Sequence, residues 1–314
     1  MKPLSLSGIK VVNFGLNLPG PMLAARLMRK GADVQHIEPP AGDPTRTMFR
    51  AADGVPLLYS LLHDGGDTVM LDLRDSAQRG VALAQCESAD IVIDTFLPGA
   101  LGKLGIDEGG LRGKNKGLIY CSINGFARRA DSFALPGHDI NFLAASGVAD
   151  ALGLSPTGPL PRFPIGDIVG GVLAAEAEIF AALVARSRDG LGRRIDISIV
   201  DVLDDLNVMA KIGARVPEDP FSAFLSGRFP CYRLYESAAG GTVALGALEP
   251  KFWERFCVLI GHPELIAHQF AARESAVGCH QTIESVMRGR SAALWEAASL
   301  ASPCCLTEVK KTNN

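Results

Sequence analysis

Short apolar runs alternate with helical segments through the first two thirds of the chain, and this alternation constrains the fold more than any other feature. Residues 9–14 form a first β run, residues 22–29 are helical and residues 32–38 form the next strand. A strand, a helix and a second strand in this order make a βαβ unit, whose strands run parallel. Runs of four to six apolar residues are typical of central strands that are covered on both faces. We therefore expect an α/β fold.

The same pattern continues beyond the first unit, with strands predicted at 68–73, 90–94, 118–123 and 194–199 and helices at 76–87, 172–187 and about 200–212. A Pro- and Gly-rich segment follows, and beyond it we expect a hairpin of 232–236 with 242–248 and helices at 251–260 and 281–300. The sequence thus predicts a large Rossmann-like α/β domain with a parallel sheet, residues 1–213. A linker, 214–230, leads to a smaller α+β domain, 231–314.

The loop after the first strand argues against a nicotinamide dinucleotide. Residues 15–21 do not read GxGxxG, and Pro19 and Pro21 lack the backbone N–H groups that a pyrophosphate would accept from.

Composition narrows the class of protein further. Hydrophobic residues make up 47% of the 314 positions and charged residues 21%, as in ordinary globular proteins. A net charge of −3 gives no electrostatic case for nucleic acid. We expect no membrane span and, without an apolar signal-peptide core at the start, a cytoplasmic protein. The seven cysteines lack CxxC or His–Cys ligand spacing, so we expect reduced thiols and no metal site.

Two candidate catalytic residues, His138 and Asp167, each stand at the start of a predicted helix. Asp167 precedes an Ala-rich apolar run, so we interpret it as the N-cap of that helix. Gly170 and Gly171 would let another group approach the first turn. A helix N-terminus offers free N–H donors and a partial positive charge, where a carbonyl oxygen can gather negative charge. Spacing alone does not favour catalysis here, because a capping Asp and a hydrogen-bonded structural His are the more common roles of such residues.

The motif Gly137-His138-Asp139-Ile140-Asn141-Phe142, followed by Asp167 with its Gly-Gly, resembles the family III CoA-transferase and α-methylacyl-CoA racemase family. The resemblance continues through Gly246-Ala247-Leu248-Glu249-Pro250-Lys251-Phe252-Trp253 and runs from about Leu4 to about Leu306. His138 favours the racemase-like branch, because transferases of the family generally lack that residue. The resemblance implies an interlocked homodimer. The resemblance also leads us to expect several tens of further residues at the C-terminus, a segment that returns to the large domain in relatives and is not part of these 314 residues.

The activity that the resemblance implies is racemisation at the α-carbon of a 2-methylacyl-CoA-type thioester, an isomerase reaction of lipid metabolism. His138 and Asp167 would act as acid and base on opposite faces of that carbon. The N–H groups at the start of the Asp167 helix would stabilise the enolate oxygen. Glu249 would hold the His138 imidazolium. Coenzyme A enters as part of the substrate, and no tightly bound cofactor is expected.

For the coenzyme A site, the resemblance and the remaining basic residues together indicate six positions: Arg46, Leu73, Arg74, Leu97, Lys103 and Gly137. Several positions that carry Lys or Arg in relatives do not do so here: His36, Gly66, Asp67 and Leu97. Each replacement removes a charge-assisted hydrogen bond to phosphate. We therefore expect weak coenzyme A binding or a different acyl carrier.

Two alternatives remain open. In a CoA-transferase, Asp167 would be a nucleophile that attacks the thioester, although an anhydride mechanism has no evident need for His138. Alternatively the chain is a weakly catalytic or non-catalytic subunit of a hetero-oligomer. The acyl group of the substrate is not indicated by the sequence.

Overall fold

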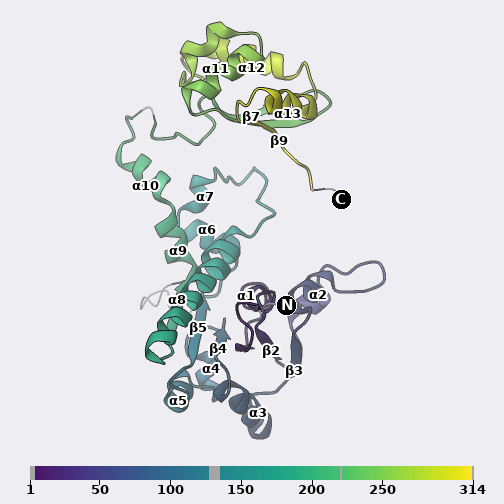
Figure 1. Cartoon of the computed structure of the whole chain (residues 1–314), viewed down its shortest axis with the longest axis vertical. Coiled ribbons are helices and arrows are strands. Elements are labelled where there is room, and N and C mark those ends of the chain that lie inside the picture. The colour runs from purple at the N-terminus through teal and green to yellow at the C-terminus, as the bar shows by residue number, and fades with distance from the viewer. Residues whose placement is uncertain (1–3, 127–134, 220, 313–314) are drawn as a thin grey trace. The chain divides into compact units, whose positions relative to one another are not determined.

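The computed structural model describes residues 4–126, 135–219 and 221–312. The chain forms two compact units, Met1–Val208 and Met209–Asn314, coloured purple to teal and green to yellow in Figure 1. The division lies a few residues before the predicted linker 214–230, whose first two residues complete helix α10 (Val208–Arg215). Pro220, within that linker, lies outside the described residues.

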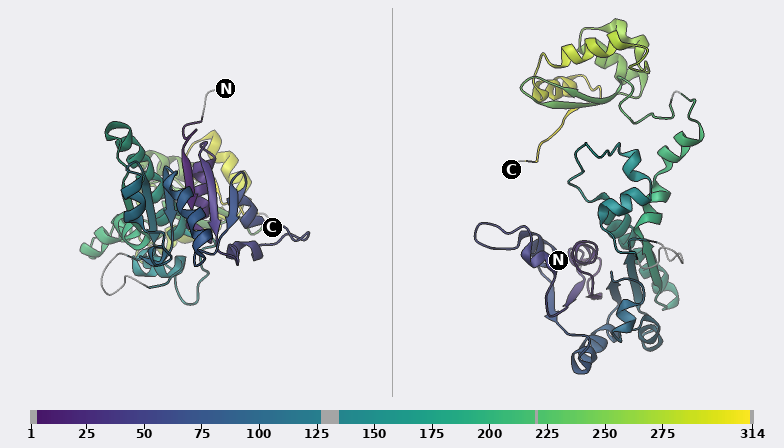
Figure 2. Two further views of the ribbon diagram at one scale, coloured as in Figure 1. Left: turned by 90° about the horizontal axis from the view of Figure 1, so that it is seen from below. Right: turned by 180° about the vertical axis from the view of Figure 1, so that it is seen from behind.

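A six-stranded parallel sheet forms the centre of the large unit. Its strands are β1 (Lys10–Asn13), β2 (Asp33–Glu38), β3 (Asp67–Met70), β4 (Ile91–Asp94), β5 (Ile119–Asn124) and β6 (Arg194–Ser198). They are arranged in the order β3-β2-β1-β4-β5-β6, and every pair is parallel. This is the strand order of doubly wound Rossmann folds, in which the winding direction reverses between β1 and β4. Figure 2 (left) shows the strands side by side, and the predicted α/β class is confirmed.

Two hydrophobic cores cover the two faces of this sheet, because successive side chains of a strand point in opposite directions. Val11 and Ile91 face α1 (Pro19–Met28) and α8 (Ala174–Asp189), which lies alongside β5 in Figure 1. Val12, Val92 and Tyr120 belong to the other core, with α3 (Ser76–Glu87), α4 (Ala100–Lys103) and α5 (Glu108–Lys114). Burial on both faces explains why the strands read as continuous apolar runs.

The loop after β1 packs tightly on the helix that follows it. A Cβ atom on Gly15 would lie 2.6 Å from the Gly20 Cα atom, so neither position has room for a side chain. Helix α1 begins at Pro19 and not at residue 22 as predicted. The N–H groups in the first turn of a helix have no acceptor within the helix, so Pro19 at the first position does not interrupt it.

A continuous helix covers residues 166–189, and its first eight residues, η2 (Gly166–Leu173), have π-helical geometry. The prediction that Asp167 is the N-cap is wrong, because the cap is Ile165 and Asp167 lies inside the first turn. The glycine pair does allow a close approach. A Cβ atom on Gly170 would lie 3.0 Å from the carbonyl oxygen of Ile199, the first residue of α9 (Ile199–Leu206).

The same helix, Gly166–Asp189, is long and apolar enough to cross a membrane by length and composition, with a mean hydropathy of 1.9 over the best window. This helix is an exception, by length and composition alone, to the expectation of no membrane span. Core helices pass the same test, and this one packs against β5 and β6. Within it, the buried Glu176 carboxylate pairs with Arg26 and Lys30 at 2.6 and 2.9 Å.

Shorter elements complete the large unit: η1 (Pro44–Thr47), α2 (Leu57–His63), α6 (Asp139–Ala145) and α7 (Val148–Ala151). The helix predicted at about 200–212 is two helices, α9 and α10, because α9 ends at Leu206 and Asn207 separates the two.

The small unit contains an antiparallel sheet of β7 (Tyr232–Glu236), β8 (Thr242–Gly246) and β9 (Leu306–Glu308), in the order β7-β8-β9. The predicted hairpin is confirmed. Besides most of α10, the described residues of this unit form α11 (Pro250–Leu259), η3 (Pro263–His268), α12 (Val277–Met287) and α13 (Ala292–Ala301). The single helix predicted at 281–300 is wrong, because the chain turns at Gly289 and Ser291 caps α13 by accepting from the Leu294 N–H.

Candidate active site

Loops at the carboxyl edge of the parallel sheet enclose two cavities, at the place where open α/β sheets bind their ligands. The first has a volume of about 270 Å³ and is lined by the loops after β1, β4 and β5 together with α6 and η2, including Asn17, Leu97, Gly137, His138 and Asp167. The second has a volume of about 440 Å³ and is lined by the loops after β1 to β4, including Phe14, Glu38, Leu73, Arg74 and Phe96. The predicted catalytic pair therefore shares the smaller cavity.

His138 is the residue at which the chain turns from an extended segment into α6. Its backbone is extended, at φ −126° and ψ 174°. Its N–H donates to Asn141 Oδ1 at 3.0 Å and its carbonyl oxygen accepts from the Asn141 N–H at 2.8 Å. Asn141 thus fixes the backbone of His138 from both sides. The imidazole itself is exposed at the cavity wall, where a substrate can reach it.

Asp167 lies half-buried in the first turn of η2. Burial raises the pKa of its carboxyl group to about 6, the charge of Asp139 acts in the same direction, and His138 acts in the opposite direction. A carboxyl group with this pKa exchanges its proton close to neutral pH, which is what a general acid or base requires. His138 and Asp167 together therefore offer the cavity two groups that can carry a proton.

Two of the N–H donors at the start of the Asp167 helix are not free, contrary to the sequence-based expectation. The Asp167 N–H donates to Asp139 Oδ1 at 2.9 Å, and the Ile168 N–H donates to the Pro164 carbonyl oxygen at 3.0 Å. First-turn donors with no intrahelical acceptor are present at the start of α6, on Asp139 and Ile140, directly after His138.

Glu249 is the N-cap residue of α11 in the small unit, with an exposed side chain. Its carbonyl oxygen accepts from the Phe252 N–H at 2.9 Å. The predicted role of Glu249 in holding His138 stays a prediction.

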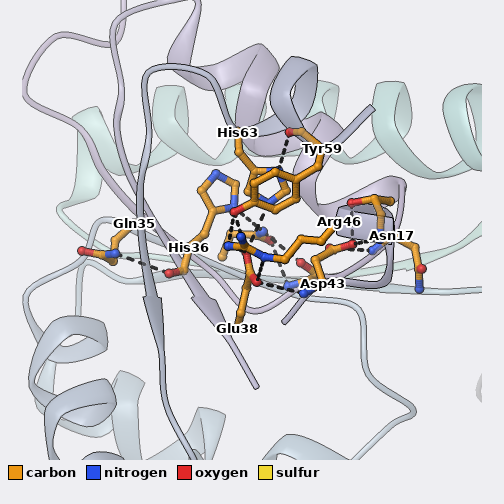
Figure 3. A network of polar contacts seen from close by, with 11 residues as sticks. Asn17, Gln35, His36, Glu38, Asp43, Arg46, Tyr59 and His63 are labelled. Atoms are coloured by element: carbon orange, nitrogen blue, oxygen red, sulfur yellow. Dashed lines mark hydrogen bonds and ion pairs between the residues drawn. The ribbon is translucent and has the colours of Figure 1, made fainter. Parts of the chain in front are cut away.

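Arg46 is engaged inside the protein. Its Nε donates to Glu38 Oε2 at 2.8 Å, its Nη2 donates to Glu38 Oε1 at 3.1 Å, and Nη2 also contacts the Tyr59 hydroxyl (Figure 3). Its guanidinium carbon lies 4.0 Å from the centroid of the Tyr59 ring. A guanidinium with two bonds to one carboxylate has most of its charge compensated, which weakens the case for Arg46 as a phosphate ligand.

His36 belongs to the same network and is 1% exposed. Its Nδ1 lies 3.1 Å from Asn13 Nδ2, which donates to it, and its ring centroid lies 4.3 Å from that of His63. Burial is the main cause that lowers the pKa of His36 to about 3, with the neighbouring His63 acting in the same direction and the charge of Glu38 in the opposite one. His36 is therefore a neutral core residue and supplies no cation to a ligand.

The remaining predicted coenzyme A residues are divided between the cavities. Leu73 and Arg74 line the larger cavity, whereas Leu97 and Gly137 line the smaller one. Lys103 lines neither cavity and is exposed in the last turn of α4. Among the described residues, the charged groups of Arg74 and Lys103 have no ion-pair partner, so both are available to an anion.

Sequence reasoning missed the Asp139 side chain, which contacts the backbone of Asp167. The available signal was its place in the GHDIN motif, since an acidic side chain in the first turn of a helix can accept a hydrogen bond from a backbone N–H group. Within the described ranges, no group of three or more His, Cys, Asp or Glu side chains could hold a metal ion.

The fold and the cavity define a doubly wound α/β protein. An imidazole and a carboxyl group whose pKa is about 6 lie together at the C-terminal ends of its parallel strands. Residues 6–314 match the family model of CoA-transferase family III, and the chain belongs to this family. The resemblance found in the sequence is confirmed.

Curated relatives include enzymes of both branches. A CaiB/BaiF CoA-transferase family protein of Caenorhabditis elegans is 32% identical over 81% of this chain and 72% of its own length. The human α-methylacyl-CoA racemase is 32% identical over 80% of this chain and 63% of its own length. The probable fatty acyl-CoA transferase Rv3272 of Mycobacterium tuberculosis is 28% identical over 86% of this chain and 72% of its own length. A crystal structure of Rv3272 has the same fold, with a TM-score of 0.81 at 23% identity over 99% of this chain and 86% of that one.

Proposed function

We propose that this protein racemises the α-carbon of a 2-methylacyl-CoA-type thioester by transferring a proton through an enolate. The observation that carries the proposal is the shared cavity of His138 and Asp167, together with the pKa of about 6 of Asp167. Acid–base catalysis is most effective when the pKa of the group lies near the working pH. A relative named α-methylacyl-CoA racemase supports the choice of reaction.

In this mechanism the two side chains exchange roles. Ionised Asp167 takes the α-proton of one enantiomer, and the electron pair moves to the thioester oxygen to form an enolate. Imidazolium His138 then returns a proton to the other face of the carbon, and the reverse reaction starts with neutral His138 and protonated Asp167. The first-turn N–H groups of α6 are the donors that we assign to the enolate oxygen, because those at Asp167 and Ile168 are occupied.

Coenzyme A enters as part of the substrate, and we propose no tightly bound cofactor. Arg74 and Lys103 are the cations that we assign to its phosphates, and Leu73 lines the adjoining cavity. We also propose a cytoplasmic homodimer. Sedimentation over a hundredfold dilution tests the dimer, and a native mass with two chain types would point instead to the hetero-oligomer.

CoA transfer is the second candidate, favoured by relatives such as the probable fatty acyl-CoA transferase. The Asp167 carboxylate would then attack the thioester carbonyl and expel the CoA thiolate to form an acyl anhydride. His138 has no role in that step, which is why we place racemisation first.

Deuterium exchange separates the two reactions. The protein is incubated with (R)- and with (S)-2-methylacyl-CoA in D₂O, without an acceptor acid. Racemisation incorporates deuterium at the α-carbon and converts each enantiomer into the other. A transferase leaves the α-carbon untouched and, in a parallel incubation with an added carboxylic acid, moves CoA to that acid, a result that would overturn our first choice. Asp150→Asn, an exposed Asp on α7, is the control for loss of a surface carboxylate.

A further inference from the structure

Asp139 joins the two elements that carry the candidate catalytic pair. It is the first residue of α6, directly after His138, and its Oδ1 accepts from the Asp167 N–H at 2.9 Å across a sequence separation of 28 positions. The residue before η2, Ile165, has no side-chain acceptor to offer. The first turn of η2 therefore receives its capping acceptor from a different helix.

The packing around this hydrogen bond leaves little room for a side chain at position 166. A Cβ atom on Gly166 would lie 3.0 Å from Asp139 Oδ1 and 3.5 Å from the Asp139 carbonyl oxygen. Glycine at this position lets the carboxylate reach the backbone of the next residue. From the other side, Ile199 and Leu203 of α9 fill the space beside Gly170. The turn that carries Asp167 is thus held between α6 and α9.

The contact also has an electrostatic consequence, because two carboxylates lie close together. Like charges disfavour the ionised form of each other. The charge of Asp139 is the second cause, after burial, of the raised pKa of Asp167. Asp139 is not among the residues that line the cavity, so its carboxylate acts on a substrate only through Asp167.

We propose that Asp139 is a positioning residue, whose carboxylate fixes the turn that carries Asp167 and places a negative charge beside it. This inference rests on the proposed acid–base role of Asp167. The hydrogen bond sets where Asp167 stands in the cavity, and the charge sets the pH at which Asp167 passes its proton. One side chain therefore tunes both the geometry and the acidity of the candidate catalytic acid.

Asp139→Asn separates the two effects, because an amide oxygen can still accept from the Asp167 N–H but carries no charge. Carboxyl ¹³C NMR of the full chain with labelled aspartate measures the pKa of Asp167 directly, and the Asp167→Asn spectrum identifies its resonance. We expect this pKa to fall by about one unit in Asp139→Asn. The acid limb of the deuterium-exchange profile should move down by the same amount. Asp150→Asn should change neither quantity.

A second variant covers the case in which Asp139→Asn does not fold. Gly166→Ala pushes the carboxylate away without changing the charge count, and we expect the same direction of shift with a smaller size. A merely structural Asp139 would lower the Tm and leave both the pKa and the pH profile unchanged, and that result would overturn the proposal. If the pKa moves in protein that exchanges no deuterium, the positioning role stands and the proposed racemisation fails.

Discussion

The carboxyl edge of the large sheet uses similar side chains in two opposite ways. Beside β5, an exposed His138 and a half-buried Asp167 face one cavity, and the Asp167 carboxylate accepts no hydrogen bond from the described residues. Beside β2, the Glu38 carboxylate accepts from Arg46, Tyr59 and the Asp43 backbone, so its oxygens are already bonded within the protein (Figure 3). The first region keeps its polar atoms for a ligand, whereas the second uses them to hold the loops after β2 in place.

The largest expected effect tests the region beside β5. His138→Ala and Asp167→Ala should each slow racemisation by about 10²–10⁴-fold, because each removes one positioned acid or base. Exchange of the α-proton from a single enantiomer can survive in either variant. Racemisation rates in both directions, by chiral separation of the products, give the measurement. His268→Ala, an exposed His of the small unit, is the control. Near-normal rates in both variants would show that this cavity does not perform the chemistry.

The second effect concerns the region beside β2. Glu38→Gln keeps the shape of the side chain but leaves Arg46 without a counter-charge, so we expect a loss of about 2–4 kcal/mol in the free energy of unfolding. Urea denaturation of the full chain measures it. The matched control is Glu87→Gln, which removes a surface ion pair with Lys114 and should cost less than about 1 kcal/mol. Equal losses in the two variants would mean that the buried network is no more important than a surface pair.

The third effect follows from His36, which stays neutral in the folded chain because its pKa is about 3. The unfolded chain binds a proton at His36 below about pH 6.5 and the folded chain does not. Stability is therefore highest above pH 6.5 and falls as the pH is lowered toward 3, by up to about 1.4 kcal/mol per pH unit. Urea denaturation between pH 7 and 5 should show a smaller slope for His36→Asn than for the unmodified chain. His268→Asn should keep the slope, and an unchanged slope in His36→Asn would contradict the assignment.

The smallest expected effect compares two cations. Arg74→Gln should weaken coenzyme A binding by about three- to tenfold, since an exposed charge-assisted bond to phosphate is lost. Arg46→Lys should change it less than twofold, because Arg46 is already paired with Glu38. Calorimetric titration at two salt concentrations measures both, with the Arg74 contribution decreasing as salt rises. A larger loss of coenzyme A affinity in Arg46→Lys than in Arg74→Gln would contradict our assignment of Arg74 to the phosphates.

Much of the fold could be predicted because it depends on local periodicity. Helix α3 is found at the predicted residues, 76–87, where an Asp before the first turn caps the helix. All six strands of the large sheet overlap their predicted positions. Errors occurred where a helix was interrupted without a proline, as between α12 and α13, since Gly289 alone is compatible with a continuous helix.

The candidate site could be predicted only in part. His138 and Asp167 were found from the motif, but their environment depends on side chains that reach across the fold. Nothing in the local sequence indicates that Glu38 forms an ion pair with Arg46, or that Asp139 accepts a hydrogen bond from the Asp167 N–H. Both contacts join segments whose distance is set by the packing of whole elements, and a one-dimensional pattern carries no information about that distance.

The strand order also determines when the cavity can form during synthesis of the chain. The Lys10 N–H, at the start of β1, donates to Asp90 Oδ2, 80 positions later, and β5 must wait for β6 beyond position 190. At roughly 5–20 residues per second, the ribosome takes several seconds to deliver each missing neighbour. Until β6 arrives, β5 is an open edge with unpaired N–H and C=O groups. A chain whose synthesis stops before position 194 would therefore contain His138 and Asp167 without a finished cavity. Its open β5 edge would also make it prone to aggregation.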